Sequence, residues 1–349
     1  MKGPAVWAAI MGAAMLHGGL AWAGSAMGDP AAAPVVEPGY TVARTPWGDP
    51  DFRGTWPVQN INDARIPLER PEALATRAWL TDAEFAARVA AAEASDAAFS
   101  TGIGADGSVG LAAWLRASRL GRRSSLVVDP PDGRLPPLTP RAQELYAKGR
   151  STWQSGDAVD GISDLDPFER CITRGFPAVM LPQPYNNGLR VFQAPGYVVL
   201  QLETFGTRVI PLSAAGHRPQ AVRAWHGDSR GRWEGDTLVI ETTNIVSGDS
   251  VASDMSRRAA GPVPGRTNAT QPVGPSAKVI ERLTRTGPDT IDYRVTYDDP
   301  EVFAAPWTVA LERTRDDGYA IFEYACHERN TVREAITSAR AARKTASGR

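Results

Sequence analysis

The feature that most constrains the fold is a series of short segments, rich in β-branched and aromatic residues, that begins after Cys171. Glycine, proline or aspartate separates these segments, a pattern typical of β-strands joined by tight turns. Connections such as 286–289 and 315–318 resemble hairpin turns, so neighbouring strands are expected to be antiparallel. The sequence therefore predicts a mainly β fold, an antiparallel meander that closes into a barrel or a strongly curved sheet. Its eight strands would be 190–193, 197–203, 207–212, 237–244, 278–286, 290–297, 307–313 and 319–326.

Alternation within the segment 290–297 predicts which of its faces is buried. Tyr293, Val295 and Tyr297 share one face, and polar or charged residues occupy the other. In a closed barrel, apolar faces of this kind either fill the core or line a cavity for a lipophilic ligand. A filled core is the expected outcome for this number of strands, and a ligand cavity is the alternative.

Residues 1–23 have the pattern of a signal peptide. Lys2 supplies a positive charge, the apolar run 5–16 is too short to span a bilayer, and Ala21-Trp22-Ala23 fits a cleavage site. The mature protein is therefore expected to be periplasmic or secreted. No later segment has about 18 uninterrupted apolar residues, so a membrane span is not expected.

The region 24–165 is predicted to be an irregular N-terminal section with one or two helices that wraps the barrel. Thr81 and Glu84 form a capping box before an alanine-rich run, which predicts a helix up to Phe99. Thr139 and Pro140 predict the start of a second helix. The β-barrel domain would then occupy 166–330, followed at 331–349 by a short helix and a basic tail.

Cys171 and Cys326 are the only cysteines of the chain. In an oxidising compartment, two cysteines are expected to form one disulfide, since only one pairing is possible. The alternative is a pair of buried free thiols that behave as small apolar residues.

Charge and motif content exclude several classes of function. A net charge of −1 argues against a nucleic-acid partner, which requires a concentrated positive face. The chain lacks a Gly-x-Gly-x-x-Gly motif, a Walker loop, a Gly-x-Ser-x-Gly elbow and a His-Glu-x-x-His motif. These absences predict a protein without a nucleotide cofactor, and no other cofactor is expected.

Two sequence blocks carry a resemblance to known proteins. Residues 227–242 read GDSRGRWEGDTLVIET, and residues 323–328 read EYACHE. Together with shorter motifs between Gly54 and Ala341, they resemble a broad family of exported bacterial proteins without a settled activity. The resemblance implies export and a set of candidate residues, but no chemistry. Gly54-Thr55-Trp56 is also similar to the Gly-x-Trp of the first lipocalin strand, which implies a lipocalin-like barrel.

Acid–base chemistry requires a group that titrates near neutral pH beside a partner of different protonation preference. His327 with Glu328 is the first candidate, although a strand-end histidine bonded to backbone is an equal alternative. His217 is the second, with Glu203 and Arg208 on the preceding predicted strands. A metal site would require His217, His226 and His327 to converge, and isolated histidines are more often satisfied polar residues, so no metal is predicted.

Further residues are candidates for substrate binding. Tyr185, Asn186 and Asn187 offer a phenol and two amides that could orient a carbonyl or hydroxyl; the stronger alternative is an Asn-Asn-Gly turn. The other predicted binding residues are Arg208, Trp225 and Trp307. The stretch 228–231 is interpreted as a turn locked by an Asp–Arg pair, and 233–237 as a hairpin tip that shapes the rim of the site.

These observations favour a periplasmic, cofactor-independent acid–base enzyme, a lyase, isomerase or hydrolase acting on a small lipophilic or aromatic molecule. The alternative is a lipocalin-like carrier that binds such a molecule without converting it. A structural protein with a filled barrel is the third possibility. The enzyme and carrier hypotheses depend on a shared hollow that gathers distant side chains, including His217 and His327.

Overall fold

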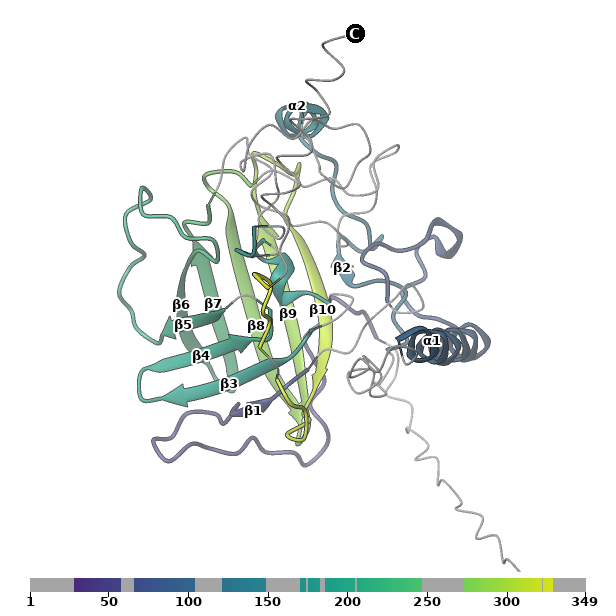
Figure 1. The fold of residues 1–349 in the computed structure, drawn as a ribbon, viewed down its shortest axis with the longest axis horizontal. Coiled ribbons are helices and arrows are strands. Elements are labelled where there is room, and N and C mark those ends of the chain that lie inside the picture. Colours follow the sequence, from purple (N-terminus) through teal and green to yellow (C-terminus); the bar gives the residue numbers. More distant parts are fainter. Residues whose placement is uncertain are drawn as a thin grey trace, which may run out of the picture.

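The computed structural model describes residues 28–57, 66–103, 121–148, 170–173, 175–182, 186–204, 206–246, 273–321 and 323–328. These residues form a mainly β protein with two antiparallel sheets (Figure 1). The smaller sheet has the order β1 (Gly54–Thr55), β3 (Leu189–Ala194), β4 (Tyr197–Leu202) and β5 (Thr207–Pro211). The larger sheet has the order β2 (Val127–Asp129), β10 (Trp307–Thr314), β9 (Thr290–Asp298), β8 (Lys278–Gly287), β7 (Thr237–Thr243) and β6 (Asp228–Glu234).

The predicted antiparallel meander is present from β7 to β10, and β6, which was not predicted, extends it. No closed barrel is found among the described strands. β5 and β6 lie side by side in parallel and are linked by one bridge, between Leu212 and Gly231. A closed barrel would also need contact between β1 and the end of β10, where the Asp316 N–H donates to the Thr55 carbonyl over 2.9 Å. A continuous ladder forms neither between β5 and β6 nor between β1 and β10, because the chain leaves the sheet after Leu212 and β1 has only two residues.

The inward faces of both sheets contribute to a single hydrophobic core. The predicted alternation of β9 is confirmed, since Tyr293, Val295 and Tyr297 are fully buried and the residues between them are half-buried. Val191 and Leu200 contribute from the smaller sheet. The aromatic rings of Tyr297, Phe303 and Trp307 pack together at one end of this core, with ring centres 5.5–6.0 Å apart.

The N-terminal section contributes an edge strand to each sheet, β1 beside β3 and β2 beside β10. The predicted capping box is present at the start of α1 (Asp82–Ile103), where Glu84 accepts the Thr81 N–H at 2.8 Å. Thr139 caps α2 (Pro140–Lys148) by accepting the Ala142 N–H at 3.1 Å. Two short 3-10 turns complete the described helices, η1 (Glu72–Leu74) and η5 (Ala178–Met180).

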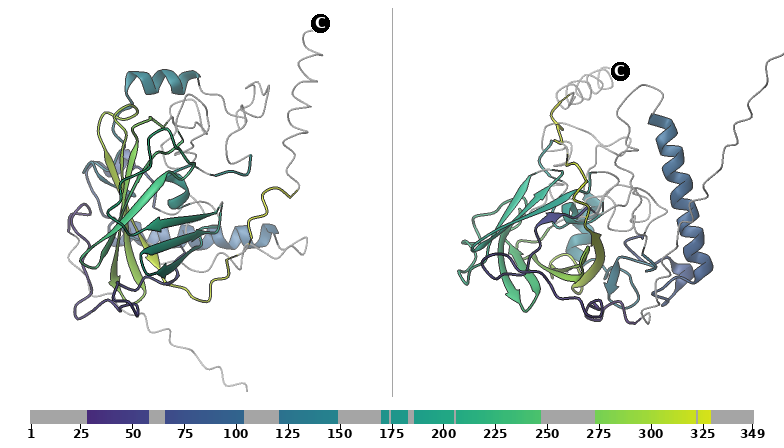
Figure 2. Two further views of the ribbon diagram at one scale, coloured as in Figure 1. Left: turned by 90° about the vertical axis from the view of Figure 1, so that its left-hand side faces the viewer. Right: turned by 90° about the horizontal axis from the view of Figure 1, so that it is seen from below.

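The long helix α1 lies beyond β2 and β10, on the opposite side of the molecule from β3–β6 (Figures 1 and 2). It therefore does not cover β6 and β7. None of the described helices combines the length and the apolar character that crossing a bilayer requires.

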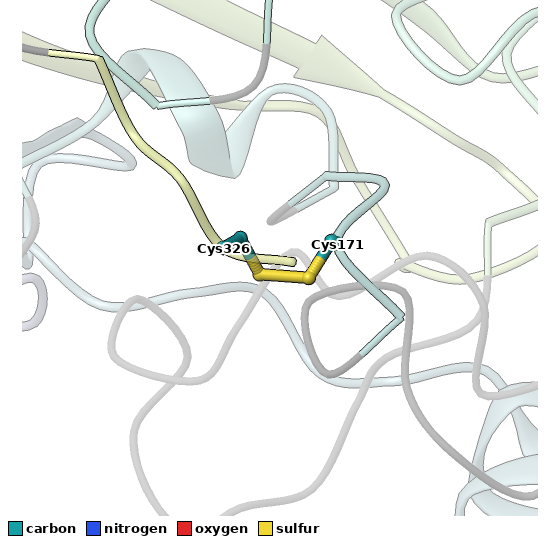
Figure 3. The surroundings of a disulfide bond; sticks show 2 residues. All are labelled: Cys171 and Cys326. Atoms are coloured by element: carbon teal, nitrogen blue, oxygen red, sulfur yellow. A yellow bond between two sulfur atoms is a disulfide. The ribbon is translucent and has the colours of Figure 1, made fainter. Parts of the chain in front are cut away.

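The predicted disulfide between Cys171 and Cys326 is confirmed (Figure 3). It joins a turn before η5 to the segment after β10. This attachment, and a hydrogen bond from the Tyr319 hydroxyl to Glu203 at 2.7 Å, explain why the described part of 319–326 is not the predicted strand. The segment follows its side-chain anchors and not a backbone ladder.

The stretch 228–231, interpreted from sequence as a turn, is the start of strand β6. The predicted ion pair is nevertheless present, with Arg230 donating to Asp228 over 2.8 Å along one face of the strand. The predicted hairpin tip is confirmed, because Gly235 adopts a φ of +61° between β6 and β7. The predictions for 1–23, 331–349 and Tyr185 lie outside the described residues.

Candidate functional site

His217 lies against two carboxylates on neighbouring strands. Its Nδ1 is 3.2 Å from Asp228 Oδ2 on β6, and its Nε2 is 3.2 Å from Glu241 Oε1 on β7. Carboxylate oxygens only accept hydrogen bonds, so both contacts are satisfied together when each ring nitrogen carries a hydrogen. The side chain of His217 is 21% exposed, and it is therefore held firmly yet remains accessible.

The strand register explains this arrangement. Arg230 on β6 is directly opposite Glu241 on β7, and Asp228 lies two residues before Arg230 on the same face. The alternate residue Ser229 faces the core, where it binds Arg208 at 3.1 Å. The loop after β5 carries His217 across the outward face of this hairpin.

Asp228 is fixed in its orientation by three neighbours. It accepts the Arg218 N–H at 2.8 Å, Arg230 Nη1 at 2.8 Å and the His217 ring. Burial by itself raises the pKa of Asp228, but the hydrogen bonds from Arg218 and Arg230 outweigh it and hold the pKa below its usual value. The Asp228 carboxylate is therefore ionised at neutral pH and positions the imidazole.

An open pocket of about 490 Å³ adjoins this cluster. The volume is within the range of ligand sites, roughly 300–1,000 Å³. One wall is the loop after β5, with small residues at 213–216, and the other is formed by β6 and β7. The lining residues are Leu212, Ser213, Ala214, Ala215, Gly216, His217, Arg230, Gly231, Arg232, Trp233 and Glu241.

A second, much smaller cavity of about 10 Å³ brings together Glu203, Asn186 and Asn187, three of the residues predicted from sequence. Glu203 Oε2 accepts the Gly188 N–H at 2.8 Å and the Tyr319 hydroxyl at 2.7 Å. Burial, and then the hydrogen bond to Glu203, raise the pKa of Tyr319 well above its usual value, so Tyr319 acts as the donor. The cavity has room for about one water molecule.

Arg208 forms a buried ion pair with Glu281, and their side chains are 2% and 0% exposed. Its two terminal nitrogens lie 2.9 and 2.5 Å from the carboxylate oxygens. Tyr293 donates to the same carboxylate at 2.5 Å, and the guanidinium lies 4.5 Å from the ring of Phe176. This cluster occupies the space between the sheets where a ligand cavity was the alternative prediction.

His226 lies near this ion pair, with Nε2 2.8 Å from the Thr173 hydroxyl. Burial, and then the positive charge of Arg208, lower the pKa of His226 to about 4, so the ring is neutral at neutral pH. Among the described residues, no group of three or more His, Cys, Asp or Glu side chains is arranged to hold a metal ion.

The other predicted site residues have different surroundings. His327 and Glu328 are exposed on the turn after Cys326, and neither lines the pocket that contains His217. The predicted hollow shared by His217 and His327 is therefore not found among the described residues, and the site is built on His217 without His327. Trp225 is half-buried, with the Arg170 guanidinium 5.7 Å from its ring. Trp307 is 1% exposed within the aromatic core. None of these four residues adjoins either of the two cavities described above.

Sequence reasoning missed the partners of His217. Asp228 was assigned to a turn, and Glu241 was not singled out. The signal was nevertheless present as alternation, because Asp228, Arg230 and Arg232 share one face of a strand whose hairpin partner carries Glu241.

Comparison of the chain with protein-family models, with curated proteins and with solved structures gave no match. The function is therefore inferred from the geometry of the site.

Proposed function

We propose that this protein is a cofactor-independent acid–base enzyme that acts on a small, largely apolar molecule in the His217 pocket. The observation that carries this proposal is the imidazole of His217, held between Asp228 and Glu241 at the wall of a pocket of about 490 Å³. Asp228 keeps Nδ1 in place, and Nε2 is the nitrogen that exchanges a proton with the substrate. Glu241, whose side chain is 35% exposed, is the partner that can move aside.

The pair of His217 and Glu241 supplies a proton donor and a proton acceptor 3.2 Å apart. Isomerisation and elimination need such a pair, because one group removes a proton from carbon while the other delivers a proton to an oxygen. Hydrolysis is possible with the same groups if Glu241 takes its proton from water. The same two side chains can serve each of these reactions, and we therefore propose that the protein is a lyase, an isomerase or a hydrolase.

A carrier is the second candidate, and the apolar part of the pocket favours it. Leu212, Ala214, Ala215 and Trp233 line the pocket and could hold an apolar molecule without proton transfer. A lipocalin-like site in the interior is less well supported, since the Arg208–Glu281 cluster fills that space. For either function we propose a periplasmic or secreted location, with which the Cys171–Cys326 disulfide is compatible.

The decisive experiment incubates the protein in D₂O with a panel of small cyclic ketones, enones and aryl esters, and follows deuterium exchange and conversion by NMR. We expect His217→Gln to lower turnover at least about 100-fold, the usual scale for general acid–base catalysis. His327→Gln is the matched control, because it makes the same change at an exposed position, and it should retain full activity.

Two outcomes would overturn the enzyme proposal. If His217→Gln keeps the wild-type rate, the acid–base role of His217 is wrong. If the wild-type protein retains compounds of the panel and releases them without conversion or exchange, the carrier function replaces it.

A further inference from the structure

Cations outnumber anions around the His217 pocket. Apart from the buried Arg208–Glu281 pair, four arginines and three carboxylates form the described ion pairs of β6, β7, β8 and the loop before β6, so positive charge exceeds negative charge by one even when His217 is neutral. The arginines are Arg218, Arg230, Arg232 and Arg282, and the carboxylates are Asp228, Glu234 and Glu241. An excess of this sign favours an anionic ligand.

Arg232 is the cation that a ligand can recruit with the least disturbance. Its side chain is 56% exposed, and it binds Glu234 Oε1 through Nη2 at 2.7 Å. Arg282 binds the other oxygen of Glu234, so this carboxylate stays paired when Arg232 turns to a ligand. Hydrogen bonds from Arg282 and then Arg232 hold the pKa of Glu234 below its usual value.

Arg230 is less available. Only 19% of its side chain is exposed, and it donates to both the Asp228 carboxylate and the Ser229 carbonyl at 2.8 Å. Moving Arg230 would also release Asp228, which positions His217. The two arginines that line the pocket therefore have different roles. Arg230 holds Asp228 in place beside His217, and Arg232 is exposed to solvent and can bind a ligand.

Strand geometry sets the distance between the anion and the reacting groups. Arg232 lies two residues beyond Arg230, which is directly opposite Glu241. Two residues of a strand span about 7 Å. This span is comparable with a six-membered ring that bears a carboxylate, so the atom that reaches His217 would be on the far side of the ring. Ala214 and Ala215 line the same pocket from the loop that carries His217 and offer apolar surface for the ring.

We infer that the ligand of this pocket is a small cyclic or aromatic carboxylate, whose carboxylate binds Arg232 and whose ring lies against Ala214 and Ala215. Arg232 is then a specificity-determining residue, able to form a two-pronged contact with the carboxylate. This inference deepens the proposed function and rests on the same pocket.

The test titrates the full-length mature protein with benzoate, cyclohexanecarboxylate and the neutral isostere benzamide, and measures affinity by ligand-observed NMR. We expect benzoate to bind at least about 10-fold more tightly than benzamide, the scale of one charge-assisted contact. Arg232→Gln should abolish this preference. Arg282→Gln is the matched control, since it loses a cation from the same Glu234 but does not line the pocket, and it should keep the preference.

The inference is wrong if benzamide and benzoate bind equally, if neither binds, or if both arginine variants lose the preference to the same extent. Its failure is distinguishable from failure of the enzyme proposal. Conversion of neutral compounds that depends on His217 would leave the enzyme and remove the carboxylate specificity. Binding of benzoate through Arg232, together with full activity of His217→Gln on the panel, would leave the ligand class and remove the catalytic role.

Discussion

The space between the sheets and the outward face of the β6–β7 hairpin both carry an arginine–carboxylate cluster, but the two clusters differ in what they can do. Arg208 and Glu281 are almost completely buried, and Ser229, Thr242 and Tyr293 form further hydrogen bonds with them. In the outward cluster, the carboxylates are shared between several partners, and their cations are partly exposed.

The comparison shows how burial limits the exchange of partners within an ion pair. The charges of a buried pair have already lost their hydration, so separating them would leave each charge unpaired in the interior at a high cost in free energy. A half-exposed pair exchanges one partner for water or ligand at little cost. The arginine that sequence reasoning selected, Arg208, is of the first kind. His217 and Glu241 are of the second kind, which is why the proposed proton transfer involves them.

The largest effect on the free energy of unfolding is expected when a carboxylate of the interior is replaced by an amide. Glu281→Gln leaves the charge of Arg208 buried without a counter-ion, and loss of one partner of a buried pair costs about 3–5 kcal/mol. Urea unfolding should report this loss. The double variant Arg208→Met with Glu281→Leu should recover part of it, since apolar replacements of similar size leave no buried charge, although the Tyr293 hydroxyl loses its acceptor. A loss below about 1 kcal/mol in the single variant would show that the pair is not a fixed part of the core.

His226 provides an intermediate effect that depends on pH. Burial and then Arg208 lower the pKa of His226 from 6.5 to about 4 in the folded state, so the unfolded chain binds a proton that the folded protein does not. The contribution of His226 to the free energy of unfolding is therefore fully present above pH 6.5 and is lost as the pH falls towards 4. The total loss is at most about 3 kcal/mol.

Urea unfolding between pH 4 and 7 measures this slope. His226→Gln should flatten it, whereas His327→Gln, an exposed position, should leave it unchanged. An equal slope in wild type and His226→Gln would mean that His226 is not kept neutral by the interior.

Much of the fold was predictable because its signals are local. Alternation in β9, the capping box at Thr81 and the turn at Gly235 each depend on a few neighbouring residues. Barrel closure could not be predicted in this way, since it depends on whether β5 and β6 form a ladder across a loop of 16 residues that leaves the sheet. The strand predicted at 319–326 failed for a similar reason, because distant anchors hold that segment.

The site was predictable only in part. His217 and Glu203 were identified by residue type, but their partners depend on contacts across strands. Asp228 and Glu241 become partners of one ring only after the β6–β7 register and the path of the loop are known. Trp307 shows the opposite error, because an aromatic residue on an apolar strand face reads equally as ligand contact or as core.

The smallest effect on stability is expected from the same carboxylate-to-amide change in the outward cluster. Glu241→Gln keeps an oxygen that accepts from His217 Nε2, and its side chain is 35% exposed, so unfolding should change by less than about 0.5 kcal/mol. Turnover should nevertheless fall, since an amide cannot take up a proton, and a loss of about 10-fold or more is expected on the panel in D₂O. Glu241→Gln should thus lower turnover with little change in stability, whereas Glu281→Gln should mainly lower stability. If Glu241→Gln instead destabilises the protein by several kcal/mol, the outward cluster is as structural as the interior one, and the proton acceptor has to be sought elsewhere.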